Sequence, residues 1–166
     1  MPHSVPVSDL MIHRNEWPQL RAGTSVKDAV KILRILTSDN KIVHGHSTPL
    51  VLDDNYTLLG MIRLIDLLKS IRHLCDTGEE PCELGKAEAP VSELVVPFPA
   101  SVEPEDSILK ALDIMMDSGI SLMPVMQNGK LVGMIQLSDV FNKVAALLFD
   151  KEIPDDRGWM THYLHL

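Results

Sequence analysis

The sequence predicts an α/β (α+β) fold in which one small unit occurs twice and the two copies pack sheet against sheet. The first observation is a repeated phrase, GMIRLID at 60–66 and GMIQLSD at 133–139. The second is that each phrase follows an apolar stripe with helical spacing and then a hairpin pattern. The third is size, because a unit of about 60 residues buries only a marginal core by itself. Packing the apolar strands of the two copies together would stabilise both.

Each unit begins with a short extended lead-in and an amphipathic helix. The lead-ins are similar in sequence, PVSDLM at 6–11 and PVSELV at 90–95. Apolar residues then recur at spacings of three and four, from Val26 to Leu33 and again from Ile108 to Met115, which predicts two helices. Residues 104–107, PEDS, place a proline and two acids at the positive end of the second of these helices.

A hairpin and a closing helix complete each unit. In the second unit, Asn128 and Gly129 separate two apolar runs, and both residues tolerate the positive φ angles of a type I′ turn. In the first unit the turn, at 53–57, is longer by two residues. Apolar side chains at helical spacing predict closing helices over 67–74 and 140–148. Each unit is therefore expected to run helix, strand, strand, helix after its lead-in strand.

These patterns divide the chain into a first repeat at 6–75, a linker at 76–89, a second repeat at 90–149 and a C-terminal tail at 150–166. The linker is rich in Gly, Pro and Glu, which is typical of a connecting segment. The tail carries an apolar cluster after a polar, proline-bearing break: Trp159, Met160, Tyr163, Leu164 and Leu166. Two interpretations of the tail stay open, docking on the body or on a partner chain, and a disordered terminus.

Composition excludes several classes of function. The 166-residue chain has a net charge of −8, which disfavours binding to nucleic acid and to anionic membranes. No apolar run approaches the roughly 20 residues of a membrane helix, and the N-terminus lacks the pattern of a signal peptide. Cys75 and Cys82 fit neither a metal pair nor a redox pair, so we expect free thiols and a cytoplasmic location.

The motifs of common enzymes and metal sites are missing from the sequence. Residues 128–130, NGK, end like a P-loop, but Pro124 stands where that motif needs glycine and Leu131 where it needs Ser or Thr. His44 and His46 would share one face of a strand, but structural zinc normally takes four ligands. We therefore expect no enzymatic activity, no metal site and no required cofactor.

The ordered set of features, occurring twice, resembles a tandem pair of CBS domains (a Bateman module) in a stand-alone CBS-domain protein. The resemblance covers 6–149, and 119–139, GISLMPVMQNGKLVGMIQLSD, follows the family's rhythm throughout. It implies two adenosine-type clefts between the repeats, in which the aspartate that ends each phrase binds ribose hydroxyls. That role falls to Asp66 and Asp139. It also implies that the segments running into the x-Pro elements line the base pockets: His46, Ser47, Thr48 and Pro49, and Ile120, Leu122, Met123 and Pro124.

The fourth residue of each phrase departs from the Thr or Ser that this family usually carries. Gln136, with Ser138, leaves a small neutral rim that can form hydrogen bonds. Arg63 could bind phosphate through its planar guanidinium, fill the cleft, or pair with Asp66 at the surface. The aspartates also have a purely structural interpretation, as acceptors for free N–H groups at a helix start. If only one cleft binds a ligand, we expect it to be the one at Asp139.

Two hypotheses for function follow. In the first, the chain is a non-catalytic sensor that binds AMP, ADP, ATP or S-adenosylmethionine as a regulatory ligand. Because no output domain is attached, it would signal in trans to a partner protein, and the ligand must prefer one arrangement of the module. In the second, the clefts are degenerate and the chain is a ligand-free dimerisation or protein-interaction module. A homodimer is expected in both cases, since two-fold dimers are the commonest oligomers.

Overall fold

The computed structural model describes residues 5–38, 48–75 and 88–149. Several of the features discussed above lie outside these ranges, namely His44, His46, Ser47, Cys82, residues 76–87 of the linker and the whole tail. Within the described ranges, no helix combines the length and the apolar character needed to cross a membrane.

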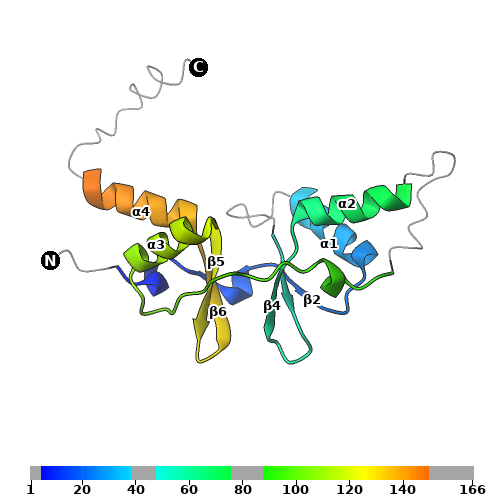
Figure 1. Ribbon diagram of the computed structural model, residues 1–166, viewed down its shortest axis with the longest axis horizontal. Helices are drawn as coiled ribbons and strands as arrows, with labels where there is room; N and C mark the ends of the chain where they lie inside the picture. The colour runs from blue at the N-terminus through cyan, green and yellow to red at the C-terminus, as the bar shows by residue number, and fades with distance from the viewer. Residues whose placement is uncertain (1–4, 39–47, 76–87, 150–166) are drawn as a thin grey trace, which may run out of the picture.

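Two layered halves, each made of a small sheet and two helices, form the molecule (Figure 1). The helices are α1 (Val26–Ser38), α2 (Leu64–Cys75), α3 (Ile108–Ser118) and α4 (Leu137–Phe149). The strands are β1 (Ile12–His13), β2 (Gln19–Arg21), β3 (Leu50–Leu52), β4 (Leu58–Met61), β5 (Leu122–Gln127) and β6 (Lys130–Gln136). Strands β2-β3-β4 form one sheet beside α1 and α2, and β1-β6-β5 form the other beside α3 and α4. The predicted α/β repeat architecture is confirmed.

Residues 103–119 show how the sequence sets the ends of α3. Ser107 is the N-cap, and its hydroxyl accepts a hydrogen bond from the backbone N–H of Lys110 at 3.1 Å. The carboxylate of Asp106 accepts from the Glu103 backbone N–H at 2.9 Å and from the Lys110 ammonium at 2.6 Å. Gly119 ends the helix in the left-handed conformation, with φ of 64°. The expected start of this helix is confirmed.

The two hairpin turns follow their sequences. Asn128 and Gly129 have φ angles of 51° and 74°, as the predicted type I′ turn requires. In the longer first turn, one carboxylate oxygen of Asp53 accepts from the backbone N–H groups of Asn55 and Thr57, each at 2.8 Å. The Asp53 side chain thus stabilises the longer turn through hydrogen bonds to its backbone, whereas the second repeat uses a tight turn with positive φ angles at Asn128 and Gly129.

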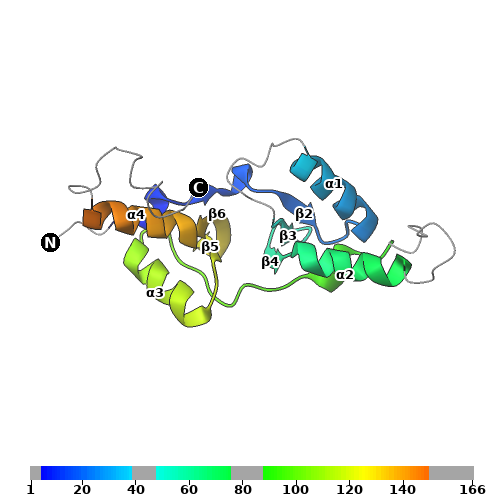
Figure 2. The same cartoon turned by 90° about the horizontal axis from the view of Figure 1, so that it is seen from above.

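Part of the lead-in of each repeat, by which we mean all of the described chain before its first α-helix (5–25 and 90–107), pairs with the hairpin of the other repeat. Strand β1 runs antiparallel to β6, with Ile12 opposite Met134. In the same way Val96, in the lead-in of the second repeat, exchanges two backbone hydrogen bonds of 2.9 Å with Met61 of β4. The sequence predicted extended lead-ins but not this exchange, which interlocks the repeats (Figure 2 shows the crossing chain from above).

This exchange explains the glycine that opens each repeated phrase. A Cβ at Gly133 would lie 2.7 Å from the carbonyl oxygen of Ile12, closer than side chains approach backbone. At Gly60, where φ is 154°, a Cβ would overlap the carbonyl oxygen of Val96. Both glycines therefore make room for the lead-in of the other repeat.

A cluster of five buried side chains joins the two sheets: Trp17, Leu50, Leu52, Leu131 and Met134. Each of the other two clusters lies within one half. Burying a leucine or methionine contributes about 1.5–3 kcal/mol to folding, so this shared cluster is a substantial interface. It confirms the predicted packing of sheet against sheet.

Candidate functional site

The two repeated phrases form equivalent corners, at which a strand ends and a helix begins. The first corner joins β4 to α2, and the second joins β6 to α4. Asp66 is the third residue of α2, and Asp139 is the third residue of α4. A carboxylate in the first turn interacts favourably with the positive end of its helix. The structure therefore places the two predicted aspartates at matching positions.

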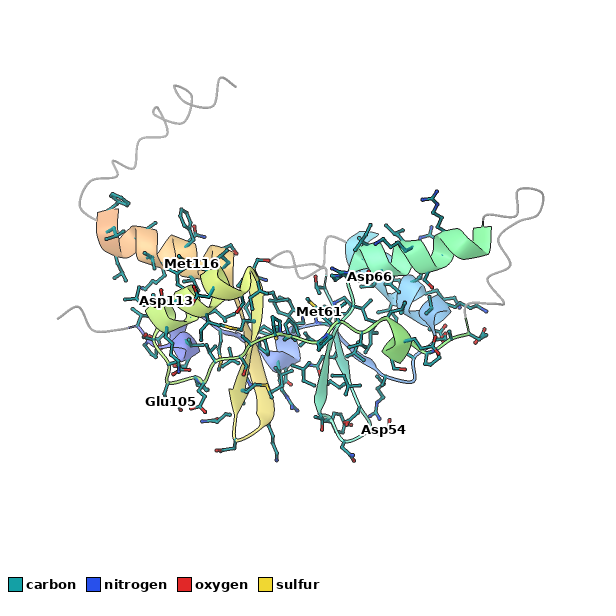
Figure 3. All side chains as sticks on the ribbon, in the orientation of Figure 1. Asp54, Met61, Asp66, Glu105, Asp113 and Met116 are labelled. Atoms are coloured by element: carbon teal, nitrogen blue, oxygen red, sulfur yellow. The ribbon has the colours of Figure 1, made fainter. Side chains whose placement is uncertain are left out.

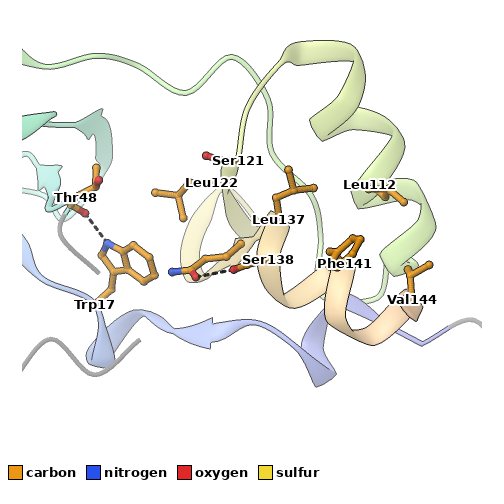
Figure 4. A pocket seen from close by; sticks show the side chains of 10 residues that line it. Trp17, Thr48, Leu112, Ser121, Leu122, Leu137, Ser138, Phe141 and Val144 are labelled. Atoms are coloured by element: carbon orange, nitrogen blue, oxygen red, sulfur yellow. Dashed lines mark hydrogen bonds between the residues drawn. The ribbon is translucent and has the colours of Figure 1, made fainter. Parts of the chain in front are cut away.

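A cavity of about 680 Å³, which we call the α4 cavity, lies at the second corner. Its lining residues are Trp17, Thr48, Leu112, Ser121, Leu122, Gln136, Leu137, Ser138, Phe141 and Val144 (Figure 4). Trp17 and Thr48 come from the first repeat and the others from the second, so the cavity spans both. Its volume lies within the roughly 300–1,000 Å³ typical of small-molecule sites. Four residues predicted from sequence line it: Thr48, Leu122, Gln136 and Ser138.

Trp17 forms one wall of the α4 cavity and was not predicted as a site residue. Its indole N–H donates a 2.8 Å hydrogen bond to the carbonyl oxygen of Thr48, which holds the ring in place (Figure 4). Next to Trp17, the Ser138 hydroxyl donates a 3.3 Å hydrogen bond to the Gln136 side-chain oxygen. The only sequence signal for Trp17 was an isolated tryptophan in a lead-in, within a chain that is 4% aromatic.

Asp139 lines a second cavity, of about 550 Å³, which we call the lead-in cavity. It is bounded by Asp9, Leu10, Met11, Ile12, His13, Glu16, Asp139, Asn142, Lys143 and Ala146. Ser138 and Asp139, adjacent in the chain, thus border different cavities on two faces of α4. Within the described part of the chain, the Asp139 side chain has no hydrogen-bond or ion-pair partner.

Asp66, the corresponding carboxylate in the first repeat, accepts a hydrogen bond at each of its two oxygens. The Arg63 guanidinium donates to both oxygens of Asp66, from Nε at 2.6 Å and from the terminal nitrogen at 2.9 Å. This hydrogen bonding holds the pKa of the Asp66 carboxyl below its usual value, against partial desolvation, which acts in the opposite direction. Of the arrangements expected for Arg63, the structure has the ion pair with Asp66.

The remaining residues predicted for the site lie mostly within the protein. Pro49, Met123 and Pro124 are buried, and Met123 belongs to the core cluster of the second half. Ile120 is half-buried and packs against that cluster. None of these four lines the α4 cavity or the lead-in cavity. No group of three or more His, Cys, Asp or Glu side chains that could hold a metal ion occurs among the described residues.

Comparison with known proteins identifies the family. A sequence model of the CBS domain matches residues 7–73 and again 91–146. The chain belongs to the CBS-domain family. The two matches confirm the predicted tandem pair of CBS domains. Among curated proteins, no sequence matches the chain.

Solved structures of CBS-domain proteins share this fold. CBSX2 in complex with AMP is 26% identical, with a TM-score of 0.62 over 88% of this chain and 98% of that chain. A CBS domain-containing protein of unknown function from Bacillus anthracis is 23% identical, with a TM-score of 0.64 over 90% of this chain and 95% of the other. The cytosolic domain of the Mg²⁺ channel MgtE, in complex with ATP, is 22% identical, with a TM-score of 0.61, and the match covers 85% of this chain and 49% of that one. The last two likenesses show the fold alone.

Proposed function

We propose that this CBS-domain pair is a non-catalytic regulatory module that binds an adenine nucleotide or adenosyl compound at the start of α4, with AMP as the first candidate. The observation that carries the proposal is the α4 cavity, which lies between Trp17 and Thr48 of one repeat and Gln136 and Ser138 of the other. A ligand there contacts both repeats, so its presence or absence changes the stability of the whole pair.

The walls of the α4 cavity suit a purine base. The buried Trp17 ring is held by its hydrogen bond to Thr48, and Leu122 adds an apolar surface. The indole is 4% exposed, so it offers a ligand an apolar edge of the wall and not an open stacking face. Because the ring is already fixed, little side-chain entropy is lost when a ligand packs against it.

The first turn of α4 suits the ribose and phosphate of such a ligand. The Asp139 carboxylate has no partner among the described residues and borders the lead-in cavity, so a base in the α4 cavity must place its ribose across the first turn of α4 for the vicinal hydroxyls to donate to Asp139. The N-terminal end of α4 favours a phosphate, and Ser138 adds a hydroxyl at the same turn. Lys143, one turn further along and on the lead-in cavity, supplies a positive charge.

The comparison with CBSX2 supports this choice of ligand, since that protein binds AMP and is similar along almost its full length. For regulation, AMP must bind one arrangement of the module more tightly than another, because equal affinities would shift nothing. The chain would then pass this change to a separate partner protein.

Thermal unfolding in the presence of AMP, ADP, ATP and S-adenosylmethionine at millimolar concentration tests the proposal. A ligand at 100 times its Kd stabilises the folded state by about 2.7 kcal/mol. For a chain of this length that corresponds to a rise in Tm of roughly 5–10 °C, at about 2–4 °C per kcal/mol. If none of the four compounds raises Tm, the proposal is wrong.

Two aspartate variants connect the binding to α4. Asp139→Ala removes a charged acceptor whose hydrogen bonds contribute about 1.5–3 kcal/mol, so we expect Kd for AMP to rise roughly ten- to hundredfold. Asp113→Ala removes an exposed carboxylate on α3 (Figure 3) and should leave Kd unchanged. Equal losses in the two variants, measured by calorimetry, would point to a nonspecific charge effect.

A second candidate function, self-association, is favoured by exposed apolar side chains on α2 and α4. Leu68 on α2 is 54% exposed, and Phe141 and Leu148 on α4 are 66% and 71% exposed. Both helices lie on the upper side of the molecule in Figure 1. Large exposed apolar patches often mark interaction sites, and a second copy of this chain offers the same surface. We therefore propose that this helical face forms a homodimer.

Molar mass in solution tests this second function. Phe141→Asp places a charge on the helical face and should convert a dimer to a monomer, because a carboxylate without a partner is costly in an interface. Tyr56→Asp, at the turn between β3 and β4, adds the same charge on the lower side of the molecule in Figure 1, away from the helical face, and should leave the mass unchanged. A wild-type protein that is monomeric at high micromolar concentration would contradict the dimer.

A further inference from the structure

The two corners formed by the repeated phrases differ at the fourth residue, and this difference decides whether the aspartate has a partner. At the second corner the fourth residue is Gln136, and the Asp139 carboxylate has no partner among the described residues. At the first corner the fourth residue is Arg63, and both oxygens of Asp66 accept from its guanidinium at 2.6 and 2.9 Å. Otherwise the phrases match in their glycine, Met-Ile, leucine and terminal aspartate.

We propose that Arg63 acts as an internal competitor that closes the Asp66 corner to nucleotides, so that each chain binds one nucleotide, at the Asp139 corner. This inference rests on the proposed function. It adds the number of ligands per chain and the residue that sets this number.

The chemistry of the Arg63–Asp66 pair supports this competition. Ribose hydroxyls are neutral donors, whereas the guanidinium is a charged, planar donor whose fork matches the two carboxylate oxygens. The arginine is also attached three residues before Asp66, and residues at this spacing are neighbours on a helix. Unlike a ligand, it is always present at the carboxylate. A ribose must therefore displace a bidentate contact before it can bind Asp66.

Two further features of the first corner agree with this arrangement. The position equivalent to Ser138 is Ile65, which has no hydroxyl to offer a ligand and is half exposed. In addition, Arg63 directly precedes the start of α2, where a positive charge is unfavourable next to the helix dipole. Asp66 compensates that charge, so the two side chains stabilise each other in the closed arrangement.

Counting AMP molecules bound per chain tests the inference, by calorimetry or equilibrium dialysis on the full chain. We expect one AMP per wild-type chain. Arg63→Gln gives the first corner the residue found at the second corner, frees Asp66, and should raise the count to two. Arg72→Gln removes an exposed arginine further along the same helix and should leave the count at one.

The reciprocal change tests the same mechanism at the second corner. Gln136→Arg places an arginine three residues before Asp139, as Arg63 stands before Asp66. We expect it to weaken AMP binding at least tenfold, with a far-ultraviolet circular dichroism spectrum like that of the wild type. Unchanged affinity in this folded variant would overturn the inference.

The possible results separate this inference from the proposed function. Two AMP molecules per wild-type chain would mean that Arg63 serves the phosphate instead of excluding the nucleotide. A single AMP in Arg63→Gln would mean that something else closes the first corner. Either result overturns the inference and leaves the proposed function intact. If neither the wild type nor Arg63→Gln bound AMP, ADP, ATP or S-adenosylmethionine, both the inference and the proposed function would be overturned.

Discussion

Replacing Gly133 with alanine tests the interlocking of the two repeats. The new methyl group would lie 2.7 Å from the carbonyl oxygen of Ile12 and 3.1 Å from the sulfur of Met11. The sulfur can move with its flexible side chain, but the carbonyl belongs to β1, which is paired with β6 at this position. Strand β1 must therefore shift away from β6 or lose its pairing.

The expected cost follows from this geometry. Forcing an extra methyl group into a well-packed site costs typically about 1–3 kcal/mol. At about 2–4 °C per kcal/mol for a chain of this length, a loss of 2 kcal/mol lowers Tm by roughly 4–8 °C. The free energy of unfolding can be measured by urea denaturation and Tm by differential scanning calorimetry.

Gly23→Ala is the matched control. A Cβ at Gly23 meets nothing within 4 Å. This substitution should leave stability unchanged or raise it by about 0.4–1 kcal/mol, because alanine restricts the unfolded chain. If Gly133→Ala is as stable as Gly23→Ala, the close approach of β1 to β6 does not constrain this glycine and the reasoning is refuted.

Three more predictions concern the second repeat. Met115→Ala should cost about 2–5 kcal/mol, because this side chain is 1% exposed, whereas Met116→Ala, at 67% exposure, should cost almost nothing in the same urea titration. Ser107→Ala removes the N-cap of α3 and should lower the free energy of unfolding by about 1 kcal/mol, whereas Ser101→Ala, outside any helix, should not. The hydrogen bonds from the Glu103 backbone and from Lys110 lower the pKa of Asp106, so its stabilising effect is present above the ordinary Asp pKa of about 4 and is lost as pH falls through the lower folded value. The difference in stability between the wild type and Asp106→Ala should therefore shrink below about pH 4, and a constant difference from neutral to strongly acidic pH would contradict this assignment.

Local sequence patterns predicted the elements of the fold because their causes are local. The apolar spacing of α1 and α3 is visible within a few turns, and the Asn128-Gly129 turn needs only two residues with positive φ. The exchange of lead-ins was not predictable in this way. Strand β1 has two residues, and nothing within them identifies β6, far away in the sequence, as its partner.

The candidate site was predicted in part. The repeated phrase indicated Gln136, Ser138 and both aspartates, because its two copies can be recognised in the sequence itself. It could not show that Ser138 and Asp139 border different cavities, since this depends on how α4 packs. Trp17 was missed because its role depends on the fold, which brings the end of one lead-in to the corner of the other repeat.

The exchanged lead-ins also have a consequence for biosynthesis. Strand β1 leaves the ribosome early, but its partner β6 lies near the end of the second repeat. At about 5–20 residues per second, the intervening chain takes on the order of 10 s to synthesise. During that interval Ile12 has no partner strand, although Trp17 can already pack on Leu50 and Leu52 of β3. The strand that is translated first is therefore among the last to be placed, and the sheet of the second half is complete only when both repeats have been synthesised.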